Sequence, residues 1–397
     1  MNRRALLIGA AAAGLIRPSP VLAQTTGVTP IFIKWDAWYN NTETVTRQFH
    51  EQLSPARWQF RAPWFCEVLG PDRITCNGQQ THVDLELQAA ANAGIKAFAY
   101  VWYGGDATGA GMSASLFRGW QLHQSSAHKD LTKWCGYAGM ERFGYNPWSN
   151  TAGWQANCNI WAQDYFKRSN YLKIGGRPVL FILNAQSQLN SHFAGSSANS
   201  VTSFNYLRSQ SVASGAGNPY IITMGSLSNF TVDSPSAGLA WVTGDAISSY
   251  VASSVLSYPK LPQPFVDLTT KNAQYWAGSQ GGTATGNKVV PIAMLGWDSR
   301  PLNAMPEFER GYTPWVGHQW YYTRGTNTEI ANHLQACVNF IGANQPACDS
   351  KIFLAYAWNE NCEGGTVGMP TLGDPPTGTP PTTALLTAIK PVLTAAA

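Results

Sequence analysis

Eight short runs of apolar and aromatic residues are spaced along the chain, separated by longer and more polar segments. Each run has the length and composition of one buried β-strand. They cover residues 30–36, 97–103, 134–141, 179–183, 220–224, 245–250, 289–295 and 352–358. The pattern therefore predicts eight strands, the last of which is an apolar, aromatic run.

Helical segments are expected between these strands. Residues 82–94 carry an apolar face, with Thr81 as the expected N-cap and Gly94 as the expected stop. Further helices are predicted around residues 154–171 and over residues 383–393. Seven of the eight strands are followed by a segment long enough for a helix; the exception is the fifth, whose link to the sixth is short and rich in Ser, Pro and Gly.

This alternation predicts an α/β fold, specifically a (β/α)8 TIM barrel in a single domain. A long insertion, rich in Trp and Pro, follows the first strand and extends to about residue 80. A doubly wound open sheet is the alternative. The barrel is favoured because no Gly-rich phosphate loop follows the first strand and polar residues end nearly every strand.

The N-terminal residues 1–23 have the form of an export signal. Arg3 and Arg4 precede an apolar segment, and small residues before Gln24 supply a cleavage site. The arginine pair leaves a twin-arginine route and a general secretory route both open. We expect the mature barrel to cover residues 24–397, without an integral membrane segment, in the periplasm or outside the cell.

Composition narrows the possible partners. Only 12% of the residues are charged, whereas 12% are aromatic and 16 are Trp. Aromatic side chains can fill a core or provide platforms for sugar rings, and most must do the former. The net charge of +4 comes without a basic run after the leader, so nucleic acid is not an expected partner. We expect a monomer.

The chain has seven cysteines, which fits an exported protein. Three local pairs are the expected disulfides, and Cys362 is left over. No CxxC motif occurs and the histidines are scattered singly, so neither a metal site nor any other cofactor is predicted. The expected pairs are Cys66–Cys76, Cys135–Cys158 and Cys337–Cys348.

In a barrel, the C-terminal ends of the strands converge on one basin. Acids, amides and aromatic residues dominate there, and glycoside cleavage needs two carboxylates with such residues around them. Trp297 and Trp358 can equally be barrel packing, and Asp298 with Arg300 can be an ion pair that braces the rim. The candidate residues are Asp36, Trp38, Tyr39, Trp102, Tyr103, Glu141, Asn184, Tyr250, Trp297, Asp298, Arg300, Trp358, Asn359, Glu360 and Glu363.

The last strand is followed by N-E-N-C-E-G at residues 359–364. This stretch resembles the N-E-x-x-E-G motif of glycoside hydrolase family 99 and its WbsX-like relatives, and residues 84–103 and 171–183 resemble that group too. The resemblance implies an exported retaining glycosidase with a (β/α)8 barrel. The motif departs from the family at Asn361 and Cys362, where bulkier residues are common.

The resemblance also implies roles for the two acids. Glu360 would deprotonate the 2-hydroxyl of the substrate, and Glu363 would protonate the leaving oxygen and later activate water. A polysaccharide or oligosaccharide is the expected substrate. Two alternatives stay open: a non-catalytic glycan-binding barrel of a polysaccharide assembly or adhesion system, and a glycosidase that uses Glu141 or Asp36 together with Glu360.

Overall fold

A computed structural model describes most of the chain beyond residue 26. It covers residues 27–41, 44–102, 114–139, 151–183, 193–225, 227–228, 231–232, 235–250, 252, 262–279, 282–303 and 321–396. The expected export signal and the candidate residues Tyr103, Glu141 and Asn184 lie outside these ranges. Within them, no helix is both long enough and apolar enough to cross a membrane.

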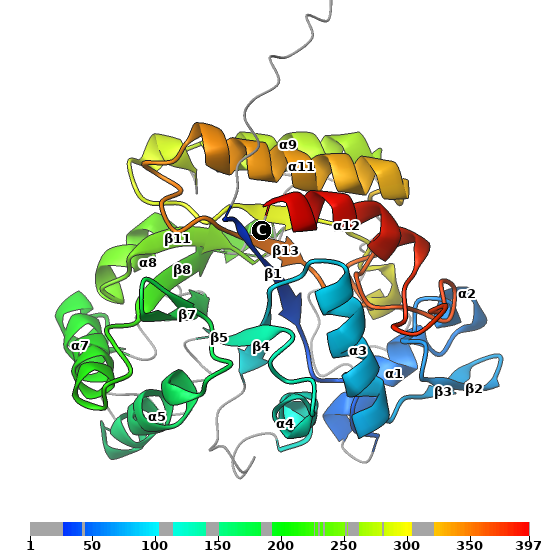
Figure 1. Cartoon of the computed structure of the whole chain (residues 1–397), viewed down its shortest axis with the longest axis horizontal. Coiled ribbons are helices and arrows are strands. Elements are labelled where there is room, and N and C mark those ends of the chain that lie inside the picture. Colours follow the sequence, from blue (N-terminus) through cyan, green and yellow to red (C-terminus); the bar gives the residue numbers. More distant parts are fainter. Residues whose placement is uncertain are drawn as a thin grey trace, which may run out of the picture.

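The predicted barrel is confirmed. All eight predicted strands are present in the described ranges, and they pair in parallel in the order β11-β8-β7-β5-β4-β1-β13-β12 (Figure 1). They are β1 Thr29–Lys34, β4 Ala97–Trp102, β5 Lys133–Gly139, β7 Arg177–Leu183, β8 Tyr220–Gly225, β11 Ala246–Ser249, β12 Ile292–Met294 and β13 Ile352–Tyr356.

The two ends of this sheet meet just before β12. Ile247 of β11 forms a parallel bridge with Val289. The Ile247 amide donates to the carbonyl oxygen of Lys288 at 2.9 Å, and the Val290 amide donates to that of Ile247 at 2.8 Å. These bonds bring the first and last strands of the order together, so the sheet is nearly closed and the strand ends face one common basin.

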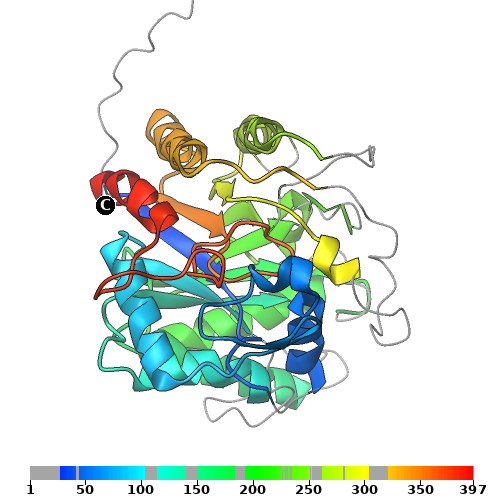
Figure 2. The same cartoon turned by 90° about the vertical axis from the view of Figure 1, so that its right-hand side faces the viewer.

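Helices surround the strands (Figures 1 and 2). The link between β8 and β11, expected to lack a helix, contains the short helix α8 Pro235–Trp241, whose leading proline suits a first helical turn. The longer helices are α1 Thr44–Leu53, α3 Gln80–Asn92, α4 Arg118–Ser125, α5 Thr151–Gln163, α7 Ser197–Ala213, α9 Phe265–Ala277, α11 Asn327–Ala343 and α12 Ala384–Ala396.

Local sequence explains where two of these helices begin and end. In α11 the Thr326 side chain accepts a hydrogen bond from the amide of Glu329, and the Glu329 carboxylate binds back to the Thr326 amide. In α3 the N-cap is Gln79, so Thr81 lies inside the first turn instead of capping it. Gly94 follows the end of α3 with φ of +87°, as its predicted stop role requires.

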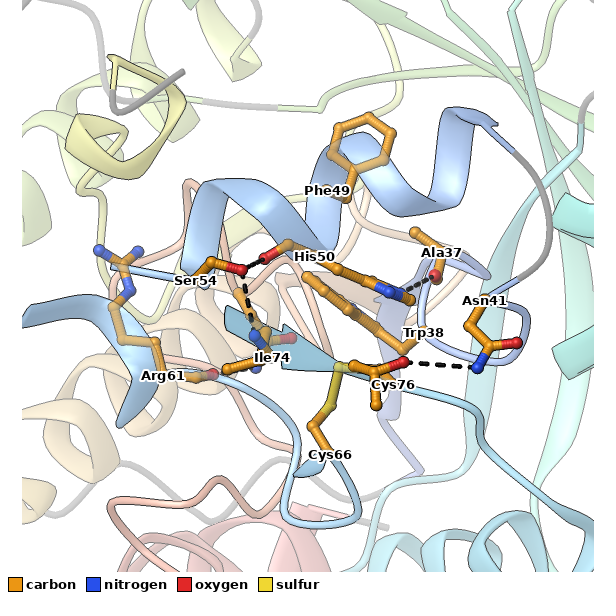
Figure 3. The surroundings of a disulfide bond; sticks show 12 residues. Ala37, Trp38, Asn41, Phe49, His50, Ser54, Arg61, Cys66, Ile74 and Cys76 are labelled. Carbon is orange, nitrogen blue, oxygen red and sulfur yellow. Dashed lines mark hydrogen bonds between the residues drawn. A yellow bond between two sulfur atoms is a disulfide. The ribbon is translucent and has the colours of Figure 1, made fainter. Parts of the chain in front are cut away.

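The insertion between β1 and β4 folds onto the chain that follows β13. It contains α1, the short α2 Ala56–Gln59 and the hairpin of β2 Glu67–Gly70 and β3 Arg73–Thr75. The predicted disulfide Cys66–Cys76 closes the base of this hairpin, because Cys66 directly precedes β2 and Cys76 directly follows β3 (Figure 3). The amide of Leu372 donates to the carbonyl oxygen of Ala62 at 2.9 Å, which ties the insertion to the last connection.

The other two predicted disulfides are wrong, because Cys135, Cys158, Cys337 and Cys348 are buried free thiols. A Cβ at Gly136 would lie 2.1 Å from the Trp161 ring of α5, so Gly136 faces that helix. Its neighbour Cys135 therefore points away from α5, which carries Cys158. Cys337 belongs to the apolar face of α11 and Cys348 to the buried turn after it, where each thiol packs as a small apolar side chain.

A buried ion pair joins the barrel to the helix layer. The Lys34 ammonium of β1 contacts the Glu86 carboxylate of α3, and both side chains are fully buried. The Tyr39 hydroxyl and the Trp358 indole N–H each donate to the same carboxylate at 2.9 Å. The Glu86 charge is thus compensated and hydrogen-bonded, the condition under which a buried carboxylate is tolerated.

Lys34→Met should lower the free energy of unfolding by about 3–5 kcal/mol, because it leaves Glu86 as an uncompensated buried charge. Urea unfolding monitored by circular dichroism measures the change. Lys288→Met is the matched control, since Lys288 pairs with Asp349 at the surface, where such a pair contributes about 1 kcal/mol or less. Equal losses of unfolding free energy in the two variants would contradict the claim that an unpaired Glu86 carboxylate is especially destabilising.

Candidate active site

Glu360 and Glu363 lie in a tight turn directly after β13. Glu360 is buried and Glu363 is partly exposed. The amide of Gly364 donates to the carbonyl oxygen of Glu360 at 2.7 Å, which closes the turn, and Gly365 continues it with φ of +75°, a conformation that favours glycine. The last strand thus delivers both carboxylates to the C-terminal end of the barrel.

Each carboxylate has a tyrosine as its partner. The Tyr250 hydroxyl donates to Oε1 of Glu360, and the Tyr356 hydroxyl donates to Oε1 of Glu363 at 2.5 Å. The two phenol rings meet edge to face with centroids 5.2 Å apart. Tyr137 of β5 stacks on Tyr250 at 5.1 Å. Because neighbouring rings hold the two carboxylates, the carboxylates lie on the same side of the turn.

This environment changes the protonation of the pair. Burial raises the pKa of Glu360, and the charge of Glu363 raises it further. Burial also raises the pKa of Glu363, whereas the hydrogen bond from Tyr356 lowers it. Two interacting carboxyl groups titrate as a unit, so the pair retains a proton at a higher pH than an isolated glutamate does. One acid and one base can therefore coexist here near neutral pH.

A second set of charges braces the rim beside Glu363. Arg300 donates to both carboxylate oxygens of Asp298, at 2.8 and 2.7 Å, as the ion-pair alternative predicted. Arg61 of the insertion approaches the same carboxylate at 3.3 Å. The Asp298 amide donates to the carbonyl oxygen of Glu363 at 2.7 Å. Trp297 is buried and packs against Tyr356 at 6.0 Å, where it forms part of the wall behind the pair.

Four other candidate residues are fully buried beneath the site. Trp358 and Tyr39 donate to Glu86, and Asn359 exchanges hydrogen bonds with the backbone of Trp35. The Trp38 indole donates to the carbonyl oxygen of Asn359 at 2.8 Å. Through these contacts all four residues support the base of the turn. Trp358 is therefore a packing residue, as one of the two sequence interpretations predicted.

Asp36 and Trp102 belong to another aromatic cluster, which involves the ends of β1 and β4. The Asp36 carboxylate accepts a hydrogen bond from the Trp120 amide at 3.0 Å, and burial raises its pKa to about 7. Trp102 packs edge to face on Trp161 of α5 at 5.1 Å. The charges that act on Asp36 are Lys34 and Glu86. Its surroundings are therefore those of the buried ion pair.

Sequence reasoning missed three residues that support the site. The sequence pattern places Tyr356 in an apolar strand, and its position near the end of that strand is the usable signal for a rim residue. Tyr137 lies in a strand in the same way. Arg61 lies in the insertion, and no sequence signal links it to a turn 300 residues later.

A (β/α)8 barrel with two carboxylates at the C-terminal end of its last strand occurs among glycoside hydrolases, although the same fold also hosts other chemistries. The chain matches no family model and no curated protein. Solved structures do resemble it. One is described as a glycoside hydrolase-like protein, with a TM-score of 0.61 and 17% identity over 96% of this chain and 97% of the other.

A second similar structure is the GH99 endo-alpha-mannosidase from Bacteroides thetaiotaomicron in complex with BIS-TRIS-propane. Its TM-score is 0.52 at 15% identity, over 94% of this chain and 97% of that one. Another structure of the GH99 endo-alpha-mannosidase from this organism has a TM-score of 0.52 at 14% identity, with coverages of 87% and 89%. The resemblance to family 99 is thus confirmed at the level of the fold.

Tyr356→Phe should raise the pKa of Glu363, because the carboxylate loses the O–H donor that stabilises its charged form. Infrared titration of the protonated carboxyl band measures the shift, with Glu363→Gln used to assign the band. Tyr171→Phe serves as the control, since the Tyr171 hydroxyl donates to the carbonyl oxygen of Val179, away from the pair. An unchanged Glu363 titration in Tyr356→Phe would refute this account of the site.

Proposed function

We propose that the protein is a glycoside hydrolase that cleaves a polysaccharide or oligosaccharide. The observation that carries this proposal is the placement of Glu360 and Glu363 on one side of the turn, each bonded to one of two touching tyrosines. A binding barrel needs no such pair with linked protonation. Two acids that share a site and differ in protonation are what general acid–base cleavage requires.

We propose a retaining mechanism with participation of the substrate's 2-hydroxyl. Glu360 accepts the proton of that hydroxyl while O2 attacks the anomeric carbon, and Glu363 donates its proton to the departing glycosidic oxygen. The product of this step is a 1,2-anhydro sugar. Water then opens it: Glu363 takes a proton from the water and Glu360 returns the first proton to O2. Both carboxyl groups end in their starting states.

The tyrosines fit these roles. Burial and the charge of Glu363 raise the pKa of Glu360 above that of Glu363, so the proposed roles require the bound substrate to draw the shared proton to Glu363. The hydrogen bond from Tyr250 then stabilises the ionised Glu360 carboxylate. Glu363 is partly exposed, which suits a group that must reach both a leaving oxygen and a water molecule. Desolvation of its carboxyl group raises its pKa to about 7, so the group can take up or release a proton near neutral pH.

We also propose that the enzyme is exported. The Cys66–Cys76 disulfide supports this proposal, because such bonds persist in oxidising compartments. The candidate leader at residues 1–23 supports it as well. The expectation of a monomer stays a prediction.

Glu360→Gln and Glu363→Gln should each reduce turnover by about 100-fold to 10,000-fold, because each removes one proton-transfer group without changing the size of the side chain. The assay incubates the mature protein with a panel of α- and β-linked polysaccharides and measures reducing ends and product size. Glu67→Gln, at an exposed position of β2, is the matched control. Binding without any release of reducing ends by the wild type would instead support the glycan-binding alternative.

A substrate of the same linkage whose reacting sugar lacks its 2-hydroxyl should not be cleaved, because the internal nucleophile is missing. The hydrolysis products of the ordinary substrate should keep the anomeric configuration, which proton NMR during the first turnovers detects. Trapping a covalent sugar on a carboxylate of the protein, or rapid cleavage of the 2-deoxy substrate, would rule out participation of the 2-hydroxyl.

A further inference from the structure

We propose that Arg61 is a positioning residue, which fixes the turn that carries Glu360 and Glu363 from a segment remote in sequence. This inference rests on the proposed function, since it assumes that these two glutamates are the reacting pair. Arg61 is only 5% exposed and comes from the insertion after β1, at the end of α2. It touches none of the reacting groups.

Arg61 reaches the turn from two directions. Its backbone carbonyl oxygen accepts a hydrogen bond of 2.6 Å from the side-chain amide of Asn361, which lies between the two glutamates in sequence. Its guanidinium donates from Nη2 to the backbone oxygen of Asp298 at 2.9 Å, and Nη1 lies 3.3 Å from Oδ2 of the same residue. One residue therefore contacts both the turn and its neighbouring loop.

Asp298 completes the connection. Its amide donates to the carbonyl oxygen of Glu363 at 2.7 Å. A Cβ added to Gly365 would lie 3.0 Å from the Cβ of Asp298, so the two segments are already in close contact. These contacts form a closed ring. Arg61 binds Asn361 on one side and, through Asp298, Glu363 on the other, so the ring encloses residues 361–363 of the turn.

Arg61 is itself held firmly. The amide of Gly373 donates to the carbonyl oxygen of Phe60 at 2.8 Å, and that of Leu372 donates to the carbonyl oxygen of Ala62 at 2.9 Å, so its two neighbours are paired with the chain after the turn. The Cys66–Cys76 disulfide lies a few residues further on, in the segment drawn in Figure 3. Because Arg61 is anchored in this way, it can hold the turn in one position.

The obvious alternative is that Arg61 only stabilises the fold. The chain provides a test of that alternative, because the same motif occurs at the opposite end of the barrel. There Arg208 and Arg177 share the carboxylate of Asp245, at 3.0 and 2.7 Å, as Arg61 and Arg300 share that of Asp298. Asp245 directly precedes β11, so this second cluster lies at the N-terminal ends of the strands.

Arg61→Met should lower kcat by about 10-fold to 100-fold while KM changes much less, because small displacements of reacting groups are costly. Once the turn relaxes, the hydrogen bond from Tyr356 weakens, and the pKa of Glu363 rises. Since Glu363 acts as the acid, the alkaline limb of the pH–rate profile should move to higher pH. Arg208→Met should lower the thermal unfolding temperature without changing kcat or the profile.

Asn361→Ala provides a second route, because it removes the other contact of the ring and leaves the arginine in place. Arg61→Lys keeps the charge but not the forked geometry, and it should fall between the wild type and Arg61→Met. The proposal is overturned if Arg61→Met and Asn361→Ala both keep the kinetics and the pH profile of the wild type and only unfold at a lower temperature. Arg61 would then only stabilise the fold.

Infrared titration of Glu363 needs no substrate, so it separates this inference from the proposed function. If the wild type hydrolyses no glycan, the proposed function fails. A shifted Glu363 titration in Arg61→Met, with an unchanged titration in Arg208→Met, would still support positioning by Arg61. An unshifted titration in Arg61→Met and in Asn361→Ala would overturn it, whatever the enzyme cleaves.

Discussion

One backbone hydrogen bond ties the turn of the candidate site to the neighbouring loop: the amide of Asp298 donates to the carbonyl oxygen of Glu363. It joins the loop after β12 to the turn after β13, and these strands are neighbours in the barrel. Two glutamates three residues apart can face the same ligand only if the turn between them has one conformation. Arg61 and Arg300 pair with Asp298 and Gly365 packs against it, whereas the two tyrosines hold the carboxylates directly.

The aromatic excess has mainly an architectural purpose. Trp120, Trp134 and Tyr165 meet edge to face, and Trp102 packs on Trp161 in the same manner. Such contacts fill the space between strands and helices with large, well-oriented side chains. Beneath the turn, the indoles of Trp38 and Trp358 also contribute hydrogen bonds. A chain with few charged residues can therefore support the polar site through indole N–H and phenol O–H groups.

The sequence was most informative where a local pattern determines the outcome. A buried strand needs a continuous apolar run, and all eight runs proved to be strands; Glu360 and Glu363 follow the last run directly. Contacts between segments that are distant along the chain leave no recognisable pattern in the sequence. The pairing of cysteines depends on which face of a strand each one occupies, which explains the error at Cys135. The role proposed for Arg61 depends on three-dimensional neighbours, so the sequence could not indicate it. The end of its strand marks Tyr356 as a rim residue, but the hydrogen bond to Glu363 could not be assigned from the sequence.

The thiols have a practical consequence. Cys135, Cys158, Cys337, Cys348 and Cys362 are all free and buried, and burial raises the pKa of each thiol. A thiol that is both protonated and inaccessible does not react with alkylating reagents. These five side chains are distributed over β5, α5, α11, the turn after it and the loop after β13. Mass-resolved alkylation would therefore record the order in which separate parts of the barrel open, without an engineered label.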